Sequence, residues 1–159
     1  IADNSSSVVI GQNVDVTNTN VNRVAIGNSA GYNSQGYGSV AIGENAGAQN
    51  QSILSVAVGL NAGNSNQNNS SVAVGHGAGY SYQGYNSIAI GQYAGQYNQA
   101  SYSIVLNASG NELNGDTSGL FIDPIAYTAA QDVIYDGIMF YNTNTKEVRY
   151  SYSLDGGDF

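Results

Sequence analysis

Few side chains in this chain are suited to acid–base, nucleophilic or metal chemistry. Of its 159 residues one is histidine, three are Lys or Arg, and none is cysteine. His76 has no partner near it in the sequence, and Lys146 forms no recognisable nucleophile–base pair with a serine. The run Asp155-Gly156-Gly157-Asp158 is only loosely similar to a calcium-binding loop, and a frayed acidic terminus is the better interpretation. We expect no enzyme activity, no catalytic residue, no metal site and no bound cofactor.

Charge and hydropathy exclude two classes of partner. The net charge is −8, yet only 9% of the residues are charged, whereas about 25% is usual. Three basic residues are too few for a protein that binds nucleic acid through its phosphates. No apolar run approaches the roughly 18 residues that a membrane helix requires. We therefore expect neither nucleic-acid binding nor membrane insertion.

Tyrosine is the residue type best suited to binding, since the chain has 13 tyrosines and no tryptophan. Several fall in stretches rich in Asn, Gln, Ser and Gly, a composition that adaptable recognition surfaces share. One interpretation is packing along the molecular surface, and the other is contact with a receptor or a glycan. For the second interpretation the candidate residues are Tyr80, Tyr82, Tyr85, Tyr93 and Tyr97.

These residues lie in a strict repeat with a period of sixteen. The motif Ser-Val-Ala-Ile-Gly, or a close variant, occurs seven times without an insertion. The copies begin at Ser7, Arg23, Ser39, Ser55, Ser71, Ser87 and Ser103. An Ala-Gly pair follows most copies, and a glutamine follows that pair, at Gln35, Gln51, Gln67, Gln83 and Gln99. The first and last copies are degenerate, as expected for the end units of a stacked solenoid.

A unit of this length is too short for a pair of helices and fits one coil of a β-solenoid. Val and Ile, at motif positions 2 and 4, share one face of the strand, while Ser, Ala and Gly share the other. Because the second face carries only small residues, we expect the strand to be buried on both sides, between the coil interior and a second surface. That second surface is either the opposite strand of a flat roll or a neighbouring subunit. The glutamines are expected to form a structural ladder, with amide-to-amide hydrogen bonds along the axis.

The C-terminal part of the chain lies outside the repeat and carries most of the charge. Eight of the 11 acidic residues fall at or after Glu112. Residues 138–141 and 147–152 are predicted to form a hairpin around a polar turn. We predict two domains, a repeat β-roll over residues 1–118 and a C-terminal β cap segment over residues 119–159.

The repeat Ser-Val-Ala-Ile-Gly-x-x-Ala-Gly resembles the head repeats of trimeric autotransporter adhesins. Its fuller form, at residues 27–43 and 75–91, is similar to repeats in fibre proteins of phages and large DNA viruses. The order of three later segments is also similar to the stretch that follows such repeats in viral fibres. These segments are SIVLNASG (residues 103–110), GLFIDPI (residues 119–125) and FYNTNTKEVRYS (residues 140–151).

The repeat predicts an all-β fold of seven coils, and the resemblance implies a left-handed parallel β-roll that intertwines as a homotrimer, with a C-terminal β-hairpin cap. It further implies a structural and adhesive module of a trimeric surface or viral fibre. Such a module is extracellular or on the virion surface and presents a binding surface for host attachment. Three alternatives stay open: a bacterial trimeric adhesin head, a self-assembling extracellular filament, and a carbohydrate-binding module. Because the chain begins at Ile1, we expect a fragment or a processed chain.

Overall fold

A computed structural model describes residues 6–15, 22–125, 138–146 and 148–151 of the chain. Within these ranges the secondary structure consists of strands and turns, with no helix. The chain divides into two compact units, Ile1–Pro124 and Ile125–Phe159, which are treated separately below. The predicted all-β fold is confirmed.

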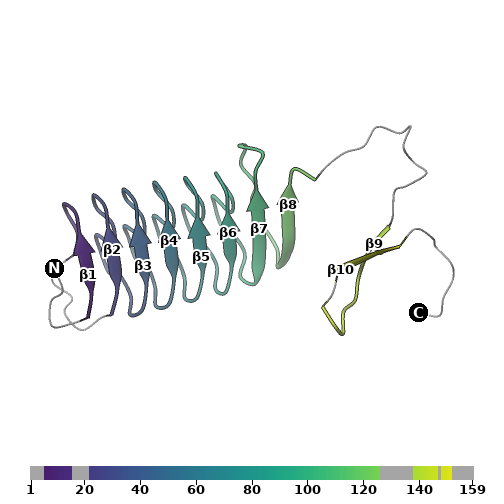
Figure 1. The fold of residues 1–159 in the computed structure, drawn as a ribbon, viewed down its shortest axis with the longest axis horizontal. Helices are drawn as coiled ribbons and strands as arrows, with labels where there is room; N and C mark the ends of the chain where they lie inside the picture. The colour runs from purple at the N-terminus through teal and green to yellow at the C-terminus, as the bar shows by residue number, and fades with distance from the viewer. Residues whose placement is uncertain (1–5, 16–21, 126–137, 147, 152–159) are drawn as a thin grey trace. The chain divides into compact units, whose positions relative to one another are not determined.

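The first unit is a β-solenoid built on one parallel sheet of eight strands, arranged in sequence order (Figure 1). The register advances by one repeat per strand, so that Val8 pairs with Val24 and Val24 with Val40. This confirms the prediction that one repeat forms one coil. The strands are β1 (Val8–Ile10), β2 (Val24–Ile26), β3 (Val40–Ile42), β4 (Val56–Val58), β5 (Val72–Val74), β6 (Ile88–Ile90), β7 (Ser103–Asn107) and β8 (Gly119–Asp123). Coils 1 to 7 are numbered here from the seven motif starts given above, each motif start being position 1 of its coil.

Each coil turns at residues with left-handed backbone, and two of these positions require glycine. Gly59 at position 5 has φ 125°, and a Cβ added there would lie 2.8 Å from the carbonyl oxygen of Gly75 in the next coil. Gly63 at position 9 has φ 52°. Positions 7, 12 and 16 are also left-handed in most coils and are occupied mainly by Asn and Ser, residues among those that tolerate this conformation.

The interior of the solenoid is lined by small side chains. Serines at position 1 are buried and satisfied locally, as Ser55 Oγ donates to the carbonyl oxygen of Ser52 at 2.6 Å. The fully buried core cluster comes from positions 3 and 8 and consists of Ala25, Ala30, Ala41, Ala46, Ala57, Ala62, Ala73, Ala78, Ala89, Ala94 and Val105. Since alanine fills little volume, the two walls of each coil lie close together.

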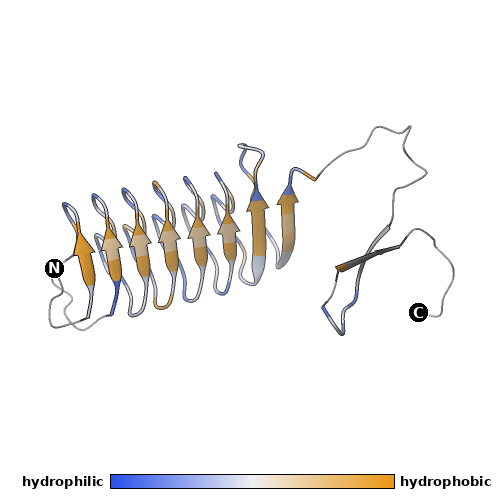
Figure 2. Ribbon diagram, in the orientation of Figure 1, coloured by the Kyte–Doolittle hydropathy of each residue, from blue (hydrophilic) through white to orange (hydrophobic). Residues whose placement is uncertain are grey.

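The valines and isoleucines at positions 2 and 4 point away from this core. Val8 and Ile10 are 40% and 54% exposed, and the equivalent residues of later strands are half-buried or exposed. Figure 2 shows the hydrophobic strands side by side from β1 to β8. The single chain covers only the small-residue face of the strand, so the second surface is not the opposite wall of the same coil. Burial of the other face against a neighbouring subunit stays a prediction.

The ends of the solenoid use larger residues than the middle. Val14, Leu113 and Phe121 are partly buried and pack against the alanine core. Phe121 belongs to β8, which pairs with β7 as an eighth parallel strand. The solenoid unit therefore extends to Pro124, beyond the boundary predicted after residue 118.

The second unit contains an antiparallel pair, β9 (Ile138–Tyr141) and β10 (Val148–Ser151). In the connecting turn, Asn142 Oδ1 accepts hydrogen bonds from the backbone N–H groups of Asn144 and Thr145, at 2.9 and 3.0 Å. The predicted hairpin is confirmed. The acidic run at residues 155–158 lies outside the described residues.

Candidate interaction surfaces

The five repeated glutamines lie inside the solenoid and are at most 2% exposed. Gln67 Nε2 donates to the carbonyl oxygen of Val56 in the same coil at 2.8 Å, and the other four make the equivalent bond. Among the described residues, one amide-to-amide bond occurs in this column, from Gln67 Nε2 to Gln83 Oε1 at 3.1 Å. The main partner of each glutamine is thus the strand of its own coil, not the next amide along the axis as we expected.

Glutamine and glycine depend on each other in this arrangement. A Cβ added to Gly63 would lie 2.6 Å from Gln67 Oε1, and the equivalent glycines of the other glutamine-containing coils are equally close. The glutamine therefore crosses the coil in the space that glycine leaves free. This strut fixes the distance between the two walls and leaves room for alanine only.

The outward residues of the strands form the first candidate surface, which we call the aliphatic face. It consists of positions 2 and 4 from β1 to β8 and contains Val, Ile and Leu only. The aliphatic residues Ile53, Leu54 and Leu60, in the turns on either side of β4, are also exposed. Continuous apolar surfaces of this kind mark sites of protein association.

Three of the predicted tyrosines form the second candidate surface, which we call the tyrosine patch. Tyr80 and Tyr97 meet edge to face, with ring centroids 5.9 Å apart. Tyr97 pairs with Ser81 of the preceding coil, so that it lies next to the segment bearing both Tyr80 and Tyr82. Tyr82 is 61% exposed. The patch presents large, rigid aromatic area beside neutral polar groups.

The other two predicted tyrosines lie at different corners of the coil. Tyr93 is at position 7 and packs on His76, with ring centroids 5.1 Å apart. Tyr85 is at position 15, where its backbone carbonyl accepts a hydrogen bond from the N–H of Tyr102. The structure thus brings together Tyr80, Tyr82 and Tyr97 but not all five. Sequence reasoning did not single out Tyr102, which is 67% exposed. It could have been found as a tyrosine at position 16, where the other coils have mainly Asn, Ser and Gly.

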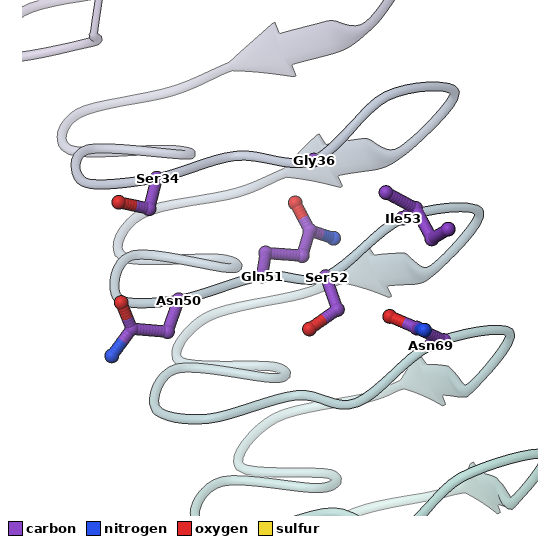
Figure 3. A pocket seen from close by; sticks show the side chains of 7 residues that line it. All are labelled: Ser34, Gly36, Asn50, Gln51, Ser52, Ile53 and Asn69. Atoms are coloured by element: carbon purple, nitrogen blue, oxygen red, sulfur yellow. The ribbon is translucent and has the colours of Figure 1, made fainter.

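A third feature is an open groove of about 420 Å³ that crosses coils 2 to 4 (Figure 3). It runs between positions 12 and 15 of the repeat. Its lining residues are Ser34, Gly36, Asn50, Gln51, Ser52, Ile53 and Asn69. Sequence reasoning missed it, because most of its lining residues differ in type from one coil to the next.

All three surfaces are nearly free of charge. Glu44 is the one charged residue between Val24 and Asn111. Arg23 is buried and makes an ion pair with Asp15, with Nη1 and Oδ2 3.6 Å apart. Within the described residues, no group of three or more His, Asp or Glu side chains is placed to hold a metal ion, and no helix is able to span a membrane.

Comparisons with protein-family models, with curated proteins and with solved structures found no match to this chain.

Proposed function

We propose that this chain is a structural and adhesive module of a homotrimeric fibre, displayed on a virion or on an extracellular surface. In this proposal the solenoid provides a rod, the aliphatic face joins three chains, and the polar sides of the coils present surface for host attachment. The resemblance of the repeat motif to trimeric adhesins and viral fibres supports both the role in a fibre and the trimeric state. The tyrosine patch is the proposed contact with a host receptor.

The observation that carries the proposal is the aliphatic face. It runs over eight strands, yet the chain itself leaves much of it exposed to water. Burying apolar surface is worth about 25 cal/mol per Å², so an uncovered face of this length favours association. Its flat, regular columns match a second copy of the same face, because identical coils present identical spacing.

The experiment uses the absence of cysteine from the chain. Sedimentation of the unmodified chain is expected to give three times the mass of a single chain. Val74→Cys places one thiol on the aliphatic face, and oxidation is expected to link chains in pairs, since two of three converging thiols can react. The matched variant Asn98→Cys, on the polar side, is expected to stay unlinked.

A sedimenting mass of a single chain would overturn the proposed trimer. Equal cross-linking by Val74→Cys and Asn98→Cys would show that association does not use the aliphatic face. Both variants leave the glutamine struts and alanine core unchanged, so circular dichroism should report the same fold as for the unmodified chain.

A further inference from the structure

We propose that the groove over coils 2 to 4 binds a neutral saccharide. The proposal gives the attachment role a ligand class, and only its biological setting rests on the proposed function. The groove is distinct from the tyrosine patch, which lies on coils 5 and 6, and from the aliphatic face on the strands.

The size of the groove suits a small ligand. Its volume of about 420 Å³ falls within the range of roughly 300–1,000 Å³ found for ligand sites. Figure 3 shows Ser34 and Asn50 at one end, Ile53 and Asn69 at the other, and Ser52 between them. The groove thus offers polar groups along its length and an apolar side chain at one end.

Two polar side chains of the groove make no hydrogen bond among the described residues, and a third has an acceptor to spare. Within the described part of the chain, neither the Ser52 hydroxyl nor the Asn69 side-chain amide makes a hydrogen bond. Asn50 Nδ2 donates to Asn66 Oδ1 at 3.0 Å, which leaves Asn50 Oδ1 as an acceptor. Amides and hydroxyls both donate and accept, as do the hydroxyl groups of a sugar, so the two sets are complementary.

Ile53 supplies the apolar contact. Its side chain is 46% exposed, although it is a large aliphatic residue. A pyranose ring carries C–H groups on one face and hydroxyls around its edge. Packing the C–H face on Ile53 leaves the edge hydroxyls free to reach Ser52 and Asn69.

The lack of basic side chains in the groove argues against anionic ligands. None of its lining residues is charged, and Arg23, the nearest basic residue in the sequence, is buried in its ion pair with Asp15. Phosphate, sulfate and carboxylate groups are bound mainly through charge-assisted hydrogen bonds from Arg or Lys. A neutral polyhydroxylated ligand is therefore the class that fits.

The test uses the full chain on an array of immobilised oligosaccharides, with neutral glucans, mannans and galactans beside sulfated and sialylated ones. We expect retention by at least one neutral saccharide and none by the anionic set. Ser52→Leu fills the groove and should weaken that binding by about tenfold or more. Ala100→Leu makes the same kind of change at position 14 of coil 6 and should leave binding unchanged.

A second variant, Asn69→Ala, keeps the test valid if Ser52→Leu fails to fold. It removes a side chain that makes no hydrogen bond within the described residues. It is expected to weaken binding without lowering the melting temperature. Retention of no neutral saccharide, or retention unaffected by both groove variants, would overturn the proposal. Loss of saccharide binding in Tyr82→Ala but in neither groove variant would also overturn the proposal, since it would place the ligand on the tyrosine patch. The sedimenting mass tests the trimer separately, so the two proposals can fail independently.

Discussion

Backbone conformation singles out a few bulky residues. Leu54, Tyr82, Tyr93 and Tyr102 all have φ between 55° and 60°. This left-handed region costs an ordinary L-residue about 1–2 kcal/mol, and the same columns elsewhere carry mainly Asn, Ser and Gly. Three of the four are tyrosines of coils 5 and 6. Side chains kept in spite of such a cost often serve binding, which is independent support for function in this part of the rod.

Tyr82→Asn tests this cost directly. Asn50, Asn66 and Asn98 occupy the same position in other coils with φ between 52° and 56°. We expect the substitution to raise the free energy of unfolding by about 1 kcal/mol and to weaken receptor contact. Chemical denaturation at fixed protein concentration measures the first effect. Tyr37→Asn, at position 15 without left-handed backbone, is the control and should bring no gain, so equal gains would contradict the strain argument.

At the scale of the element, the end coils are packed with different residues from the middle coils. In coil 1, Asp15 replaces the position-9 glycine, and Arg23 replaces the next position-1 serine. The Arg23 guanidinium binds the Asp15 carboxylate and its backbone carbonyl oxygen. In coil 7, Gly115 replaces glutamine, and the Phe121 ring lies where a Cβ of residue 115 would make close contact. In coil 7 the Phe121 ring thus occupies space that the glutamine side chain fills in the middle coils.

The ion pair between Arg23 and Asp15 predicts that the effects of substituting the two residues on the free energy of unfolding are strongly non-additive. Arg23→Ser restores the repeat residue but removes the ion-pair partner of Asp15, which is expected to cost about 3–5 kcal/mol, because a largely buried charge loses its compensation. Asp15→Gly combined with Arg23→Ser restores both repeat residues and should recover most of that loss. Denaturant unfolding of the two single variants and the double variant measures this coupling. Additive losses would contradict it.

At the scale of the molecule, the solenoid unit is a one-dimensional stack in which each coil contacts its neighbours. Its near absence of charge follows from this geometry, since a charged column repeats about every 4.8 Å and like charges directly opposite repel. The acidic residues gather instead at and after Glu112, where the repeat ends.

Stacking predicts tolerance to the loss of a whole coil. Deleting residues 71–86 removes one complete repeat and keeps every column in register. We expect a folded chain with lower stability, by roughly one coil and one interface. Deleting residues 71–78 removes half a repeat, so the residues that follow no longer lie above equivalent residues of the preceding coil unless the coil rearranges. Circular dichroism and thermal melting distinguish the two deletions. Similar melting temperatures for the two variants would contradict the idea that the stack depends on the alignment of equivalent residues.

The repeat period alone determined much of this structure. Seven uninterrupted copies of equal length define a parallel register, because every column must lie above itself. The hairpin at β9 and β10 was also predictable, since a polar turn separates two short segments that contain β-branched and aromatic residues. Tyr80, Tyr82 and Tyr97 could be proposed from composition, but their separation from Tyr85 and Tyr93 depends on which corner each position occupies.

Only the tertiary structure decided which face of the strand is inside. Alternation separates Val and Ile from Ser and Ala, and the larger apolar residues are the usual choice for a core. In the glutamine-containing coils the strut and the close walls leave space for alanine only, and valine in that position would overpack the coil. Val105 fills it in coil 7, where Gly115 replaces the glutamine. The branched residues therefore face outward as the aliphatic face. The period stacks positions 12 to 15 of coils 2 to 4, but the groove depends on side chains at these positions that differ from coil to coil.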